Sequence, residues 1–430
     1  MQSIKIIGSS ILCLLLLSTN AYSFTNSDQT AAHSTAFSSA PLDSNSAVHV
    51  SAANKVVTRK AKTIHRLSIE LHPSYVVPTH KFLRKNNLKQ EPINFSLSGH
   101  LKYAFQFKEG SKFNQMYPHA YQGIGVGYGS FFSNELGSPF GCYAFQGSRI
   151  TEFRKGLTLD YEWNFGVTFG WTEYHQEHNI YNHVIGTDID AYMNLGVMLN
   201  WQLSPHYQLS TGVAMSHFSN ANTHYPNQGL NQIEARIGVV RTFGETNDKG
   251  EFKPTTRATL RIPRHMSYDV ILYGAFRVRE YNQDHKKYIP DHGFGVYGLN
   301  FTPMYHCNNS LSAGVSLDLQ YDESANLENH VASLEGNKVT YYNQPFREKI
   351  SAGFSVRGEW AMPIFAINAG IGYNVYAKGF DSKKFYQVLA MKIFMNRNLF
   401  VHIGYQMNQF KDPNNLMLGL GYRFHQKSKQ

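Results

Sequence analysis

The feature that most restricts the fold is an alternation of apolar and polar residues with a period of two. Between residues 157 and 171, every second position is apolar, and the positions between them are polar or glycine. The apolar positions are Leu157, Leu159, Tyr161, Trp163, Phe165, Val167, Phe169 and Trp171. Side chains alternate between two faces along a β-strand. The pattern therefore predicts a long amphipathic strand with one apolar face and one carboxylate-bearing face.

The same pattern recurs at 189–203 and again near the C-terminus at 416–424. These segments are longer than the strands of soluble sandwiches, which usually have about six residues. They also end in Trp, Tyr or Phe, as expected for the aromatic girdles of a membrane barrel. The alternation therefore predicts an all-β protein, a transmembrane antiparallel β-barrel, rather than a soluble β-sandwich.

The composition agrees with a barrel and disfavours a helical membrane protein. Aromatic residues make up 14% of the chain, yet the mean hydropathy is only −0.37. A barrel reconciles these values because only alternate residues of each strand face lipid. The formal net charge is +10, and the charged residues are scattered along the chain rather than clustered in a basic block. For a secreted chain, this balance favours anionic lipid or lipopolysaccharide phosphates as partners over nucleic acid.

The N-terminus predicts secretion. Lys5 precedes a short apolar run, and Ala21-Tyr22-Ser23 fits a cleavage site, so residues 1–23 are expected to be a signal peptide. Residues 24–60 are rich in Ser, Ala, Asn and Thr and are expected to form a flexible polar tail. Residues 61–430 would then form an outer-membrane β-barrel, whose insertion is expected to need the barrel-assembly machinery.

Strand counting predicts 14 or 16 strands. About fifteen candidates follow Asn94, and a bacterial barrel has an even number. Short polar breaks near 204–206, 306–308, 361–363 and 396–398 fit periplasmic turns, and longer polar stretches between them fit extracellular loops. Two regions leave the count open: 66–77 can add a strand, and 244–265 is long and charged where a short turn is expected.

One strand carries a possible catalytic pair. Along 207–219, His217 and Ser219 share a face with Val213 and Met215, so they point toward lipid near the outer leaflet. A serine beside an imidazole has the elements of an activated nucleophile. Asn220, with backbone N–H groups near Asn222, could stabilise an oxyanion. A histidine hydrogen-bonded to a loop at the barrel rim is the alternative interpretation.

The motif around this pair resembles a known family. Met215-Ser216-His217-Phe218-Ser219-Asn220-Ala221-Asn222, followed by Tyr225-Pro226-Asn227-Gln228-Gly229-Leu230-Asn231, is similar to the signature of the lipid A 3-O-deacylase (acyloxyacyl hydrolase) family. The similarity is close over 207–243 and looser over 93–280. His72-Pro73-Ser74-Tyr75, the strand segment 161–166 and the segment 200–205 resemble larger members from Bacteroidetes-type bacteria.

The resemblance implies an outer-membrane esterase that removes an ester-linked acyl chain from lipid A. Ser219 would be the nucleophile, His217 the base, and Asn220 and Asn222 part of the oxyanion hole. It implies no metal and no cofactor, and lipid A or lipopolysaccharide as the partner.

The sequence departs from the family at the residue that orients the histidine. Well-studied members carry a glutamate on the following strand, and the register places Asn231 there. Glu234 is a possible substitute acid, but three residues along a regular strand is the opposite face, so a β-bulge would be needed. The chain could therefore be an inactive relative.

Two further functional classes fit the sequence. Fourteen or sixteen strands could enclose a water-filled channel, lined by Asp160, Glu162, Asp190, Arg277 and Arg279 and narrowed by the loop 322–348. The second class is a barrel whose extracellular loops bind a surface partner.

Overall fold

The computed structural model describes residues 64–107, 111–243, 260–283, 286–290, 292–336, 338–378, 384–409 and 412–426. The expected signal peptide and polar tail lie outside these residues. Within them most residues lie in β-strands and the helices are short, which confirms the predicted all-β class. No described helix has the length and apolar character needed to cross a membrane.

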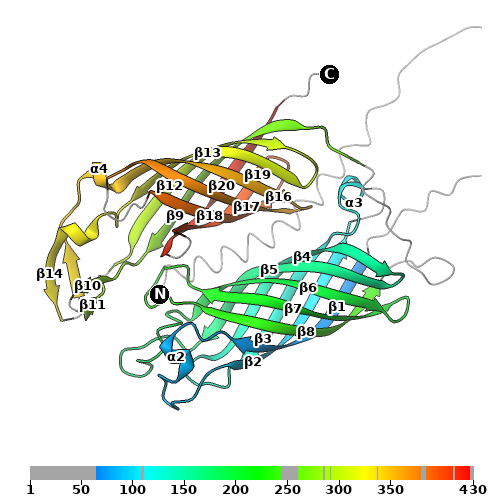
Figure 1. Ribbon diagram of the computed structural model, residues 1–430, viewed down its shortest axis with the longest axis horizontal. Coiled ribbons are helices and arrows are strands. Elements are labelled where there is room, and N and C mark those ends of the chain that lie inside the picture. The colour runs from blue at the N-terminus through cyan, green and yellow to red at the C-terminus, as the bar shows by residue number, and fades with distance from the viewer. Residues whose placement is uncertain are drawn as a thin grey trace, which may run out of the picture.

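The strands form two closed antiparallel barrels of eight strands each (Figure 1). The N-terminal barrel contains the first eight strands in chain order. They are β1 (Ile64–Val76), β2 (Phe95–Gln106), β3 (Tyr121–Ser130), β4 (Gly137–Arg154), β5 (Leu157–Trp171), β6 (Ile189–Gln202), β7 (Tyr207–Ser219) and β8 (Leu230–Phe243). It closes because β1 pairs with β8, for example at Leu67–Arg241.

The C-terminal barrel also takes its eight strands in chain order. They are β9 (His265–Arg277), β12 (Phe294–His306), β13 (Leu311–Asp322), β16 (Ile350–Ala361), β17 (Phe365–Ala377), β18 (Phe385–Phe394), β19 (Leu399–Asn408) and β20 (Asp412–His425). It closes through β9 and β20, which pair at Leu272–Leu420.

The remaining elements are short and lie in the connections. Two small hairpins consist of β10 (Tyr281–Gln283) with β11 (Lys286–Tyr288) and β14 (Val331–Glu335) with β15 (Lys338–Tyr341). The helical turns are α2 (Lys81–Arg84), α3 (Lys112–Met116), η1 (Leu327–His330) and α4 (Phe346–Lys349).

Of the two totals that the sequence allows, 14 and 16, the structure has 16 barrel strands, but they do not enclose one lumen. The two uncertain regions explain the difference. Residues 66–77 do contribute a strand, β1. The long charged stretch at 244–265 is not a turn within a barrel, because it joins the last strand of one barrel to the first strand of the next.

The two barrels lie side by side with the same orientation (Figure 1). At the end that carries the short turns, the Tyr117 hydroxyl donates to the Asn309 carbonyl over 2.5 Å. At the end that carries the long loops, the Val278 N–H donates to the Asn222 carbonyl over 3.1 Å. Equivalent ends therefore meet, as two barrels inserted in one membrane require.

The seam between the barrels is apolar. Trp163 on β5 packs edge-to-face on Phe365 of β17 with ring centroids 4.9 Å apart, and Tyr161 lies 4.8 Å from Trp360. The β4–β5 wall, which the alternation alone assigns to lipid, thus partly faces the second barrel.

The lumen of the N-terminal barrel is filled by charged side chains. Lys102 contacts the carboxylates of Glu70 and Glu162 at 2.8 and 2.5 Å. Arg236 contacts the same two carboxylates, each at 2.7 Å. All four residues are buried, and eight-stranded barrels generally have just enough interior for their side chains. This interior does not favour the channel interpretation.

Asp160 and Asp190 are buried residues of the N-terminal barrel, whereas Arg277 is buried in the other barrel. The loop 322–348 does not narrow a common lumen, because there is none. At its start, Asp322 pairs with Arg277 inside the C-terminal barrel.

Candidate active site

The structure brings His217, Ser219 and Asn231 together on the outer wall of the N-terminal barrel. The Nδ1 atom of His217 lies 2.8 Å from Oδ1 of Asn231, and its Nε2 atom lies 3.0 Å from Oγ of Ser219. His217 and Asn231 are direct cross-strand partners on β7 and β8. Regular pairing thus places the three side chains in one hydrogen-bonded row.

The direction of these hydrogen bonds suits a base. An amide oxygen only accepts, so Nδ1 of His217 carries the hydrogen and donates it to Asn231. The neutral ring then keeps the lone pair on Nε2, and the Ser219 hydroxyl donates to it. Asn231 thereby selects the tautomer in which His217 can take the proton of Ser219.

The row lies at the boundary between apolar wall and loops. Below it on the same face of β7, Val213 and Met215 are 58% and 63% exposed, whereas Ser219 at the strand end is 9% exposed. Exposed apolar side chains on this wall are the surface that lipid chains would contact. An acyl chain on this wall would have its polar end beside Ser219.

Gly229 holds the ring of His217 from the loop side. Its φ angle is +67°, a conformation that glycine adopts without strain. A Cβ atom at this position would lie 2.9 Å from Cε1 of His217. A larger residue would therefore displace the ring or the loop, which gives the glycine of the Pro-Asn-x-Gly motif a physical role.

A second loop supports this one. The Gly229 N–H donates to the Val184 carbonyl over 3.2 Å. Val184 is held by the buried Asn182, whose side-chain oxygen accepts from the N–H groups of Val184 and Ile185. The amide nitrogen of Asn182 donates to the Glu135 and Thr172 carbonyls. Sequence reasoning missed Asn182, because an asparagine in a polar loop carries no distinguishing pattern.

Asn220 and Asn222 lie one and three residues after Ser219, and their side chains help to build the loop. The Asn220 amide nitrogen donates to the His224 carbonyl at 3.0 Å. The Asn222 side-chain oxygen accepts from Asn227 at 3.4 Å. Ala221 and Asn222 have φ angles of +53° and +65°. Such angles are uncommon outside glycine and concentrate at functional sites.

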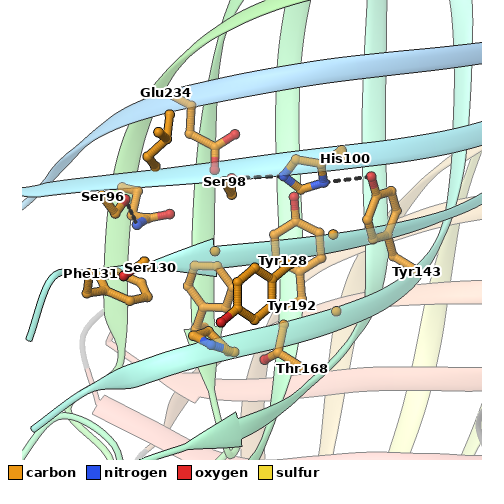
Figure 2. A pocket seen from close by; sticks show the side chains of 17 residues that line it. Ser96, Ser98, His100, Tyr128, Ser130, Phe131, Tyr143, Thr168, Tyr192 and Glu234 are labelled. Atoms are coloured by element: carbon orange, nitrogen blue, oxygen red, sulfur yellow. Dashed lines mark hydrogen bonds between the residues drawn. The ribbon is translucent and has the colours of Figure 1, made fainter. Parts of the chain in front are cut away.

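Glu234, the possible substitute acid, does not lie in the row with His217. β7 and β8 pair in continuous register with no bulge, so Glu234 points into the lumen. There its carboxylate accepts from Ser216 and Asn194 at 2.5 and 2.9 Å. Figure 2 shows Glu234 among the side chains of the lumen pocket that also holds His100 and Tyr143. In this structure Asn231 is the residue that contacts Nδ1 of His217.

Among the described residues, one group of side chains has the types and spacing to hold a metal ion. It consists of His175, Glu177 and His178 on the loop between β5 and β6, all exposed. The group is separate in sequence from the His217 row, and exposed acidic groups of this kind are common without an ion. We assign it no role.

Two family models match the chain. The model described as lipid A 3-O-deacylase (PagL) matches residues 153–240, which include β5 to β7 and most of β8. The model described as acyloxyacyl hydrolase, C-terminal domain, matches residues 266–426, which span the C-terminal barrel. Together they cover more than half of the chain. The chain belongs to the lipid A 3-O-deacylase family. Membership of a Bacteroidetes-type subgroup stays a prediction.

Solved structures resemble this deacylase-family protein only distantly. Neisserial surface protein A has 6% identity and a TM-score of 0.29, covering 42% of this chain and 97% of its own. The siderophore receptor PirA from Acinetobacter baumannii has 8% identity and a TM-score of 0.23, covering 81% and 68%. Omp33 from Acinetobacter baumannii has 8% identity and a TM-score of 0.13, covering 84% and 99%. No curated protein matches the chain.

The family match and the chain's own barrels make this an outer-membrane protein of Gram-negative type and a member of a deacylase family whose substrate is lipid A. The outer wall that bears Ser219 is therefore the surface on which to test for ester hydrolysis.

Proposed function

We propose that the N-terminal barrel hydrolyses an ester-linked acyl chain of lipid A, with Ser219 as nucleophile and His217 as general base. The observation that carries the proposal is the row from Asn231 through His217 to Ser219 on a lipid-facing wall. A nucleophile, a base within hydrogen-bond reach and a third group that orients the base are the parts such chemistry needs.

The first half-reaction forms an acyl-enzyme. Oγ of Ser219 attacks the ester carbonyl carbon while Nε2 of His217 takes the hydroxyl proton. The tetrahedral intermediate carries a negative oxygen, which we propose that donors of the loop 220–222 stabilise. When the intermediate collapses, the sugar oxygen leaves and receives the proton from His217, and the acyl group stays on Ser219.

The second half-reaction releases the fatty acid. A water molecule loses a proton to Nε2 of His217 and attacks the acyl carbon, and the Ser219 oxygen then leaves with that proton. The products are a free fatty acid and a lipid A with one acyl chain fewer, so one water is consumed for each ester cleaved.

The test is mass spectrometry of lipid A from cells that produce the protein, the Ser219→Ala variant or neither. We expect the wild type alone to shift lipid A by the mass of one acyl chain. Ser210→Ala is a matched control, because Ser210 lies on the same strand but on its lumen-facing side, away from His217. Identical lipid A in all samples would refute the proposal.

A further inference from the structure

The two barrels carry corresponding seventh and eighth strands, which allows the catalytic wall of one to be compared with the other. β7 and β8 of the N-terminal barrel correspond to β19 and β20 of the C-terminal barrel. Where each pair meets, an asparagine precedes Pro-Asn: Asn220 before Pro226-Asn227 between β7 and β8, and Asn408 at the end of β19 before Pro413-Asn414 at the start of β20. We align the two walls on this asparagine.

The C-terminal barrel lacks the catalytic side chains at the corresponding positions. Counting back from the shared asparagine, Tyr405 takes the place of His217 and Met407 takes the place of Ser219. The cross-strand partner of Tyr405 is Leu416, where the N-terminal barrel has Asn231. The thioether of Met407 has no hydroxyl or thiol that a base could activate, and the alkyl group of Leu416 cannot accept a hydrogen bond that orients a base.

The corresponding wall is also covered. Val401 and Ile403 on β19 are 6% and 8% exposed, in contrast to the open Val213 and Met215 on β7. They belong to one apolar cluster with Trp163 of the N-terminal barrel. The members of that cluster from the second barrel are Met362, Ile364, Phe365, Met391, Ile393, Val401 and Ile403. A lipid ester therefore cannot lie against this wall.

The C-terminal barrel reaches the catalytic loop directly. Val278, the residue after β9, donates its N–H to the carbonyl of Asn222. Asn222 has a left-handed backbone conformation three residues after Ser219. A hydrogen bond to its carbonyl fixes the peptide plane that it shares with Thr223, and so the direction of the loop that follows the nucleophile.

We infer that the C-terminal barrel is a non-catalytic repeat that docks through its β19 wall and holds the active-site loop of the N-terminal barrel through Val278. The part of the inference that concerns the active-site loop rests on the proposed function. Val278 is a positioning residue, since it touches the loop and not the reacting atoms. The part that concerns docking rests only on the apolar contacts between the two barrels.

The positioning role is tested in the full-length protein with Val278→Pro, which removes the N–H donor. Losing one hydrogen bond that orients the loop should lower kcat roughly three- to tenfold and leave KM nearly unchanged. Val278→Ala keeps the N–H and should retain wild-type kcat. Heat-modifiable migration on gels reports whether the barrels remain folded. A folded Val278→Pro protein with wild-type kcat would overturn the role of Val278.

The docking is tested without any activity measurement. In a Cys142→Ser, Cys307→Ser background, Tyr161→Cys and Trp360→Cys are combined with a protease site inserted in the segment joining β8 to β9. A short bismaleimide should keep the two barrels covalently linked after cleavage, whereas either single cysteine variant should not. Separation of the double variant would overturn the docking. If the Ser219→Ala variant keeps full activity, the proposed function fails while the cross-linking result still decides the docking.

Discussion

Asn231 lies where the deacylase family is expected to carry a glutamate, and the contact it makes with His217 shows what an amide can and cannot supply. Its oxygen accepts the Nδ1 hydrogen of His217, so it fixes the ring orientation and the tautomer. It carries no charge, so it cannot stabilise the imidazolium that forms when His217 takes a proton. In serine proteases, replacing the aspartate of the catalytic triad with asparagine lowers turnover about 10⁴-fold.

Asn231→Glu should therefore raise kcat, by about tenfold or more, because a carboxylate would stabilise the imidazolium. The measurement is the rate of fatty-acid release from lipid A in mixed micelles. Asn231→Gln, which lengthens the side chain without adding charge, should give no gain. Equal rates for the glutamate variant and the wild type would mean that the charge at this position does not limit the reaction.

At the level of single residues, the sequence predicts the row of His217, Ser219 and Asn231 but not the residues that hold the neighbouring loops in place. His217, Ser219 and Asn231 follow from strand alternation, cross-strand register and a motif, all of which are local. Asn182 and Val278 act through bonds between segments distant in the sequence, and no local pattern encodes such contacts. Strand alternation also predicts that Glu234 and Asn231 lie on opposite faces of β8, because residues three positions apart in a strand point to opposite sides.

Among the elements, β8 combines two tasks on its two faces. Its outer face presents Asn231 to β7, and its inner face places Arg236 between Glu70 of β1 and Glu162 of β5. Removing one partner from a buried ion network is costly, because the remaining charges stay in a low-dielectric interior. The lumen of this barrel is therefore sensitive to changes on β8.

Arg236→Met should destabilise the N-terminal barrel by about 3–5 kcal/mol, since the buried carboxylates of Glu70 and Glu162 would lose one of the two cations that they share. Urea unfolding of the detergent-solubilised protein, followed by tryptophan fluorescence, measures the change. Arg241→Met is the control on the same strand: its exposed side chain lies over the rings of Tyr207 and Phe243 and should contribute about 1 kcal/mol or less. Similar unfolding of both variants would contradict a structural role for the ion network.

The strands themselves were predictable from the sequence, and their partners were not. Alternation marks β5, β6 and β20 and shows which residues share a face. Whether a face meets lipid or protein depends on the surroundings: Trp163 and Leu195 are both outward-facing, yet Trp163 is buried in the seam and Leu195 is exposed.

On the scale of the whole molecule, the closure of the chain into two barrels is the main departure from the sequence prediction. A count of 16 strands fits either one wide barrel or two narrow ones, because β8 can in principle pair with β9 or with β1. The choice is made by long-range register, and the structure pairs β8 with β1. The long charged segment after β8 was the one local sign of this, since a hairpin turn needs only a few residues.

Buried ion pairs also occupy the C-terminal lumen, where Lys392 contacts Asp269 and Glu359. Two filled eight-stranded barrels should therefore not conduct ions as a porin does. Purified protein reconstituted in planar bilayers should show no stable conductance steps, because charged and aromatic side chains occupy the lumen. A 16-stranded porin in the same bilayers provides the positive control. Stable porin-like steps from this protein would contradict the filled lumen and revive the channel interpretation.

The location of Ser219 on an outer wall rather than in a water-filled cleft has a kinetic consequence. Substrate would reach it by lateral diffusion within the leaflet, without leaving the membrane. The relevant concentration is then the mole fraction of lipid A among its neighbouring lipids, not its amount per volume of solution. Diluting the substrate with inert lipid should slow the enzyme, whereas diluting the membranes with buffer should leave the rate per enzyme molecule unchanged.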